Sequence, residues 1–366
     1  MKNKYGTLKI LHLSCAVLFC AFTFLYLYFY QADVLTVVQH VLSGGSTHYN
    51  RTIGAVLLTI SLYFVHLLVY GITRLNRRMH ALTYFPSLLI LTVLTNVPQF
   101  YDDNLLLGSW TWIAPLLLVI YVVVIYLSKK IQPYEVTIND KGIFSQLMWV
   151  NVFVMVFMFF FVGLFSNHND VFHYKAKMEV CLRNGDYDEA LKAGKKSLAT
   201  DSTLTMLRAY ALAQKGELAE KLFEYPLVGG KDALLPDGKT VKPLMLSGPR
   251  ISQFSKKKKV SSDYRLMGLL LDKDLNGFVR QYNSYRQVSD SVGHVSDSIA
   301  YVVPKHYQEA LIIYGEKYKK PIDGCDSVRL VDYEKFLQLK RKYGKQYPSK
   351  VRDLYGKTYW WYYFFQ

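Results

Sequence analysis

The chain has 366 residues, enough for two domains of ordinary size, and carries a formal net charge of +16. Apolar residues concentrate in the first 165 positions, where there are ten Lys/Arg and five Asp/Glu; the remaining 34 basic and 23 acidic residues leave the second part at +11. A basic chain often binds nucleic acid, but the location of the charge decides its meaning. If the second part lies outside the cytoplasm, it meets no nucleic acid.

Five apolar segments are long enough to cross a bilayer, whose hydrocarbon core of about 30 Å needs roughly 20 helical residues. The third is the shortest and contains Pro86. The first could be a signal peptide, but its apolar stretch is long and no small-residue cleavage site follows it, so we expect an uncleaved anchor. The predicted transmembrane domain, residues 1–165, has spans at about 10–30, 53–73, 81–97, 110–128 and 144–165.

The short connections between these segments differ in charge. Nine Lys/Arg lie in the N-terminus and in the second and fourth connections, whereas the intervening connections hold only Arg51. Positive residues stay on the cytoplasmic side, so we expect a cytoplasmic N-terminus. An odd number of spans then places residues 166–366 on the far side, the periplasm of a Gram-negative cell.

The second part begins with a pattern typical of a helical hairpin. Helices are predicted at 171–183 and 187–198, and the turn between them, Gly185–Ala190, resembles that of a tetratricopeptide repeat (TPR). A second pair is predicted at 205–215 and 218–225. Repeat arrays need about three units because each hairpin buries only one face against its neighbour. An irregular all-α domain with one repeat-like hairpin is the alternative.

Residues 227–262 break the helical pattern with several Gly and Pro and with the run Lys256–Lys259, so we expect a loop insertion there. Helical pattern resumes at 264–271 and 276–285, and further helices are predicted at 306–319 and 332–343. The predicted fold class is therefore all-α: a five-helix transmembrane module followed by a TPR-like helical domain.

Two outer connections contain candidate site residues. His40, Ser43, Gly44, Gly45 and His48 could form a pocket, because glycine backbone can cradle an anion; the alternative is a flexible turn after an amphipathic helix. The neighbouring acids of the next outer connection suggest a glycosyltransferase-like enzyme acting on a lipid-linked substrate. Its catalytic candidates are His40, His48, Asp102 and Asp103. We expect no metal site and no cofactor, since two His lack a third ligand.

Other polar residues have plainer explanations. His66 lies inside the second span, where an ionisable residue is a functional candidate, but packing between helices explains it as well. Cys181 and Cys325 share one side of the membrane and could pair.

The C-terminal region offers a different kind of binding surface. Lys256, Lys257, Lys258 and Lys259 suit anionic lipid or an acidic glycan, and Trp360 and Trp361 suit the headgroup level. We expect one of these segments to dock the domain on the membrane. The alternative is that the aromatic tail is a final helix that caps the domain.

Three short stretches carry a resemblance: 39–45, 47–50 and 81–87. They are similar to an uncharacterised family of Bacteroidota integral membrane proteins, a domain of unknown function with a TPR-like C-terminal part, whose members often have more spans. The resemblance implies a Gram-negative inner membrane and brings no activity. We therefore expect an inner-membrane scaffold rather than an enzyme. Its spans contact the lipid bilayer, and its periplasmic TPR-like domain binds a protein partner.

Overall fold

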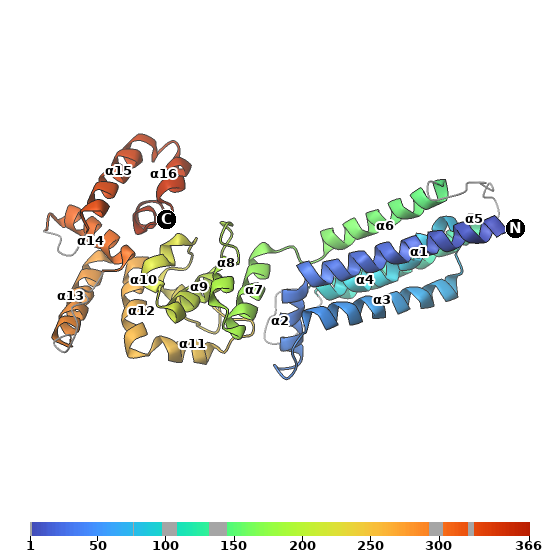
Figure 1. Ribbon diagram of the computed structural model, residues 1–366, viewed down its shortest axis with the longest axis horizontal. Coiled ribbons are helices and arrows are strands. Elements are labelled where there is room, and N and C mark those ends of the chain that lie inside the picture. The colour runs from blue at the N-terminus through green and yellow to red at the C-terminus, as the bar shows by residue number, and fades with distance from the viewer. Residues whose placement is uncertain (1, 76, 97–107, 132–144, 293–302, 321–325) are drawn as a thin grey trace. The chain divides into compact units, whose positions relative to one another are not determined.

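The computed structural model describes all residues except 1, 76, 97–107, 132–144, 293–302 and 321–325 (Figure 1). The chain divides into two compact units, residues 1–169 and 170–366, and each has its own buried core. Every regular element in the described residues is a helix, which confirms the all-α prediction.

The N-terminal unit contains four helices that are long and apolar enough to cross a membrane, at Lys9–Tyr30, Arg51–Thr73, Trp110–Lys130 and Gln146–Phe165. Figure 1 draws α1, α3, α4 and α6 alongside one another. The multi-pass membrane character expected from the sequence is therefore present. The elements of this unit are α1 Lys2–Leu25, the π-helix η1 Tyr26–Tyr30, α2 Ala32–Leu42, α3 Arg51–Thr73, the 3₁₀ helix η2 Arg77–Tyr84, α4 Phe85–Thr95, α5 Trp110–Ile131 and α6 Gln146–Phe165.

The third predicted span differs from the other four. It forms no continuous long helix; instead η2 leads into α4, which has only 11 residues. Pro86 lies in the first turn of α4, where its missing N–H costs nothing, because the first amides of a helix have no partner within the helix. The proline therefore starts α4 and separates it from the tighter helix before it.

Hydrogen bonds and a ring contact fix the directions of these elements. The Ala81 amide donates to Asn151 Oδ1 at 2.7 Å, and the Asn167 amide donates to Thr95 O at 3.3 Å, so η2–α4 runs parallel to α6. The Ser87 hydroxyl donates to Leu62 O at 2.8 Å. Together with the 5.2 Å contact between the rings of Tyr70 and His80, that bond makes η2–α4 antiparallel to α3. The short segment thus follows its long neighbours over most of their length.

The outer faces of this unit are apolar. Trp112 is 82% exposed, Phe153 72% and Ile72 72%, while the interior holds small and polar groups such as Asn151 and Ser87. Such a distribution is costly in water, where large apolar patches are rare, and is expected in lipid. The exposed faces therefore contact the bilayer.

The C-terminal unit is a chain of shorter helices. Its elements are α7 Asp170–Asn184, α8 Tyr187–Lys192, α9 Ser202–Lys215, α10 Leu218–Lys221, η4 Leu222–Glu224, η5 Gly230–Leu234, α11 Gly248–Ser255, α12 Lys258–Leu271, α13 Leu275–Val292, α14 Lys305–Tyr318, α15 Ser327–Tyr343, α16 Pro348–Tyr355 and α17 Tyr359–Phe365.

The two predicted hairpins form, but their second helices are short. The helix expected at 187–198 ends at Lys192, because the chain turns at Gly194, which has a φ of +62°. A Cβ on Gly194 would lie 2.6 Å from the Tyr174 ring, so only glycine fits there. The second pair has α10 with only four residues before a 3₁₀ turn. A repeat array stays a prediction.

Buried Arg208 of α9 holds the turns around these hairpins together. Its guanidinium donates to Pro226 O at 2.9 Å and to Thr200 Oγ1 at 3.2 Å, and it lies over the Tyr225 ring. Burial lowers the pKa of Arg208 to about 10, so the side chain stays charged at neutral pH. The hydrogen bonds to carbonyl oxygens offset part of the cost of burying that charge.

The predicted insertion at 227–262 is only partly irregular, since it contains η5, α11 and the first turns of α12. Ser247 accepts a hydrogen bond from the Arg250 amide and Pro249 occupies the first turn, which explains why α11 begins there. The irregular part is attached to α7 by the buried Glu179. Its carboxylate accepts hydrogen bonds from three consecutive amides, those of Leu244, Met245 and Leu246.

Replacing Glu179 with Ala should detach this segment from α7. Three amides lose their acceptor, which costs about 3 kcal/mol, or roughly 100-fold in local opening. Hydrogen–deuterium exchange of residues 244–246 in the full chain measures the change. Glu179→Gln, which keeps one acceptor oxygen, should have a smaller effect; equal exchange in all three proteins would contradict this role.

Candidate functional site

A surface cavity of about 460 Å³ lies in the C-terminal unit between α9 and the α11–α12 corner. Six residues line it: Tyr210, Gln214, Arg250, Gln253, Phe254 and Lys257. The volume falls within the usual range for a binding pocket. The lining combines two aromatic rings, two amides and two cations, which makes the cavity the candidate site.

Helix geometry places these side chains together. Tyr210 and Gln214 are four residues apart on α9 and therefore share a face, and the Gln214 amide donates to Tyr210 Oη at 2.8 Å. Across the cavity, Phe254 meets Tyr210 edge to face with 5.4 Å between ring centroids. The Asp201 side chain caps the start of α9 by accepting from the Leu204 amide, so the wall that carries Tyr210 is well defined.

The cavity is electropositive. Neither Arg250 nor Lys257 forms an ion pair with any residue in the described part of the chain, and both are exposed. The Lys257 ammonium lies 5.2 Å from the centroid of the Phe254 ring. Two cations without a neutralising acid favour a negatively charged ligand, and the aromatic edge favours a ligand with an apolar part.

The lysine run separates at this corner. Lys256 ends α11 and is exposed but does not line the cavity, Lys257 lines it, and Lys258 begins α12. The side chains of Lys258 and Lys259 lie outside the described residues. Of the four predicted binding lysines, the structure therefore brings one to the cavity.

The aromatic tail forms α17 and packs into the core of its own unit. Trp360 is 2% exposed and Trp361 8% exposed, and the indole Nε1 of Trp360 donates to Glu309 O at 3.0 Å. In this structure neither indole is available to a membrane surface. The tail is the capping helix of the alternative interpretation.

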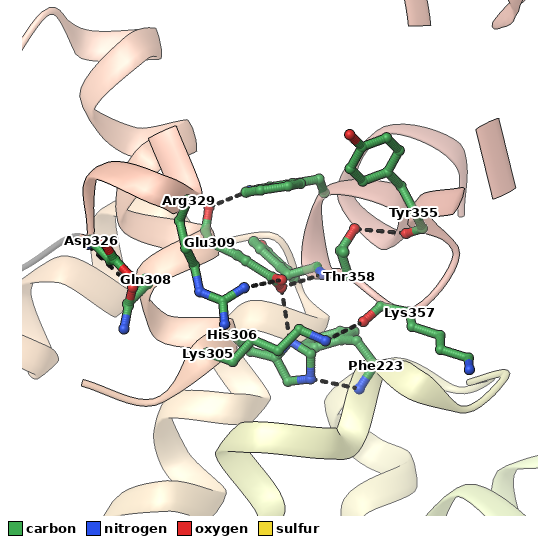
Figure 2. Close-up of polar contacts among 12 residues, drawn as sticks. Phe223, Lys305, His306, Gln308, Glu309, Asp326, Arg329, Tyr355, Lys357 and Thr358 are labelled. Atoms are coloured by element: carbon green, nitrogen blue, oxygen red, sulfur yellow. Dashed lines mark hydrogen bonds and ion pairs between the residues drawn. The ribbon is translucent and has the colours of Figure 1, made fainter. Parts of the chain in front are cut away.

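Polar contacts hold this cap, and we call the residues that make them the C-terminal lock: Phe223, His306, Glu309, Arg329, Tyr359 and Trp360. Figure 2 labels Phe223, His306, Glu309 and Arg329 of this lock. Glu309 Oε2 contacts His306 Nδ1 at 2.8 Å and accepts from the Tyr359 amide at 2.7 Å.

The hydrogen bonds around His306 define its protonation. The Phe223 amide donates to His306 Nε2, so the proton is on Nδ1 and points at the carboxylate. The His306–Glu309 pair is fully buried and no cavity residue touches it, which makes it a structural pair.

The predicted pocket at the first outer connection is a folded helix end. The Gly45 amide donates to His40 O at 2.8 Å and the Gly44 amide to Val41 O at 3.2 Å, so the amides that would cradle an anion are already engaged. Ser43 Oγ accepts from the Thr47 amide at 3.2 Å, and His48 is exposed. Asp102 and Asp103 lie outside the described residues, so the enzyme interpretation stays untested.

His66 belongs to a ring cluster inside the N-terminal unit. Its imidazole stacks on Tyr84 with 3.6 Å between centroids, and Nδ1 is 3.1 Å from Thr83 Oγ1. His12 stacks on His80 at 4.0 Å. Ring stacking from α1, α3 and η2 therefore joins three elements, in agreement with the packing explanation for His66.

Among the residues that the structure describes, no group of three His, Cys, Asp or Glu could hold a metal ion. Cys325 lies outside the described residues, so its pairing with Cys181 is not tested.

These features define an integral membrane protein with a second, helical unit that carries an electropositive cavity. The model of a family of unknown function, DUF6057, matches residues 98–252 and 249–366, and the chain belongs to this family. The stretches that carried the sequence resemblance, 39–50 and 81–87, lie outside the matched segments. No curated protein and no solved structure matches the chain.

Sequence reasoning missed most of the cavity. Tyr210 and Gln214 lie within the predicted helix 205–215 but were not singled out, and Arg250 and Gln253 lie within the predicted loop insertion at 227–262. The one available signal was the four-residue spacing in both pairs that face the cavity, 210–214 and 250–254, which places each pair on one helix face.

Replacing Glu309 with Ala should destabilise the C-terminal unit by about 3–5 kcal/mol, because the His306 and Tyr359 N–H groups lose their buried acceptor. The loss of stability is measured by heating the full chain in detergent and following, by limited proteolysis, the cleavage that occurs after Tyr355. Glu334→Ala, which removes an exposed acid of α15, is a control for charge loss. An unchanged unfolding temperature for Glu309→Ala would show that the lock is dispensable.

Proposed function

We propose that the chain is an inner-membrane scaffold whose C-terminal unit binds an acidic segment of a protein partner in the α9–α11 cavity. The observation that carries the proposal is the pair of unneutralised cations, Arg250 and Lys257, at the mouth of a cavity with an aromatic wall. Arg pairs with a carboxylate through two parallel hydrogen bonds, and Lys adds a point charge.

The other lining groups suit a peptide. The side-chain amides of Gln214 and Gln253 can donate to and accept from a peptide backbone, and the edge of Phe254 can pack against an apolar side chain. The best ligand is therefore an Asp or Glu next to an apolar or aromatic residue. TPR-like stacking of α7 to α10 would agree with this use, since such repeats present a groove lined by their first helices.

The proposal includes five crossings of the bilayer. After Arg77 and Arg78, which belong to the basic end, the six remaining residues of η2 and the eleven residues of α4 give a path of roughly 28 Å, close to the thickness of the hydrocarbon core. Their parallel path beside α6, from Asn151 to Asn167, supports a full crossing. The ring centroids of Trp110 and Phe165 lie 6.5 Å apart, so the start of α5 is close to the end of α6. An odd number of crossings that alternate in direction requires this arrangement.

The orientation of the proposal follows from charge. Basic residues cluster at the end where Arg74 and Arg78 lie, and those residues stay in the cytoplasm. Five crossings then place the C-terminal unit in the periplasm.

A photo-crosslinking amino acid at Gln253 should give one discrete adduct in intact cells. Position Leu198, also exposed but remote from the cavity lining, should give none. Adding Arg250→Glu and Lys257→Glu should reduce the adduct at least about tenfold, because two attractive charges become repulsive. When a peptide array is probed with the purified chain, the bound peptides should contain Asp or Glu beside an aromatic residue. If the adduct and the array signal both persist in the chain with Arg250→Glu and Lys257→Glu, this site is excluded.

Topology can be measured separately with a reporter fused after Gln366. Alkaline phosphatase, active only outside the cytoplasm, should be active, and green fluorescent protein should be dark when exported unfolded. The opposite result would indicate an even number of crossings and would leave η2–α4 as a re-entrant segment.

A further inference from the structure

The C-terminal unit has a second basic surface, at the end of α15 and along α16, which no feature of the proposed cavity uses. Residues 340–357 hold seven basic side chains and one acid, Asp353. We call this segment the basic corner; its cations are Lys340, Arg341, Lys342, Lys345, Lys350, Arg352 and Lys357.

The charge of the basic corner is not balanced within the protein. None of its seven cations forms an ion pair with any described residue, although salt bridges occur elsewhere in the same unit. Several are instead stacked on rings: the Lys342 and Lys350 ammonium groups lie 5.1 Å and 4.8 Å from the Tyr343 ring centroid. A net +6 in 18 residues, with Asp353 as the one acid among them, requires an external anionic partner or solvent.

Exposed apolar groups lie among these cations. Leu354 is 68% exposed and Tyr347 56% exposed. Lys350 and Leu354 are four residues apart and share an exposed side of α16, roughly a quarter turn from the buried Val351. Tyr347 directly precedes the helix. Lys, Tyr and Leu exposed on and beside a short helix are the combination that lies at a headgroup boundary, with the apolar groups inserted and the cations on phosphates.

We propose that the basic corner docks on the anionic headgroups of a lipid bilayer. A bilayer suits it better than a protein, because the cations are spread over a turn and a helix and form no cavity. The C-terminal unit is also covalently tethered to a membrane, because only residues 166–169 separate the last long apolar helix from α7. Tethering raises the effective concentration of the surface, and weak contacts then suffice.

Full-length chain in nanodiscs tests the proposal. Hydrogen–deuterium exchange of residues 343–357 should be about fivefold slower in discs with 30% phosphatidylglycerol than in discs of phosphatidylcholine alone, an effect of roughly one Lys at an anionic surface. The difference should disappear in 0.5 M NaCl, where screening is nearly complete. Lys345→Glu with Lys350→Glu should abolish it.

Matched charge loss elsewhere provides the control. Lys196→Glu with Lys239→Glu changes charge by the same amount at exposed positions outside the basic corner and should leave the difference intact. Unchanged exchange in α14 confirms that each variant folds. Equal exchange in the two kinds of disc overturns the proposal. So does protection that persists in 0.5 M NaCl or in the double reversal, since that protection would come from a protein contact.

Discussion

The N-terminal unit depends on lipid as its solvent. Its long helices turn side chains such as Phe153 outward and keep Asn151, Ser87 and His66 inside, an inversion that is stable only where water is absent. The same constraint explains the internal hydrogen bonds. Asn151 supplies the acceptor for the Ala81 amide at the 3₁₀ segment, where regular α-helical bonding is interrupted. The irregular segment can therefore lie beside α3 and α6 with the Ala81 amide paired.

The C-terminal unit is subject to a different constraint, because it consists largely of short helices. Apart from α13 and α15, its helices have 15 residues or fewer and are marginal alone, and buried polar groups join distant parts of the chain. Glu179 holds the segment before α11, Arg208 holds the turns around α8 and α10, and Glu309 holds the last helix. Each of these charged residues is fully buried and is surrounded by backbone donors or acceptors. These residues make the unit a single packed body instead of a loose array.

The two basic surfaces of the C-terminal unit differ in shape, and therefore in the ligand that suits each of them. At the cavity, two cations lie beside an aromatic wall in a surface hollow, which suits a carboxylate on a peptide. At the basic corner, five exposed cations and the half-buried Lys340 and Arg352 surround Tyr347 and Leu354 on an open surface, which suits headgroups. Overall charge cannot distinguish these uses, because both contribute to the same +11; only the shape of the surface around each cation does.

The sequence by itself determined the class of protein. Hydropathy over 20-residue windows predicted five spans, because hydrocarbon thickness fixes their length, and four of them are long apolar helices in the structure. Helical periodicity located most helices of the second unit. The sequence also supported membership of an uncharacterised family. Tertiary structure decided the rest. Whether Trp360 faces lipid or a core depends on what packs against α17, and the ends of α8 and α10 depend on Tyr174 and Arg208. The cavity joins Tyr210 to residues 40 positions away, and no local pattern encodes which helices meet.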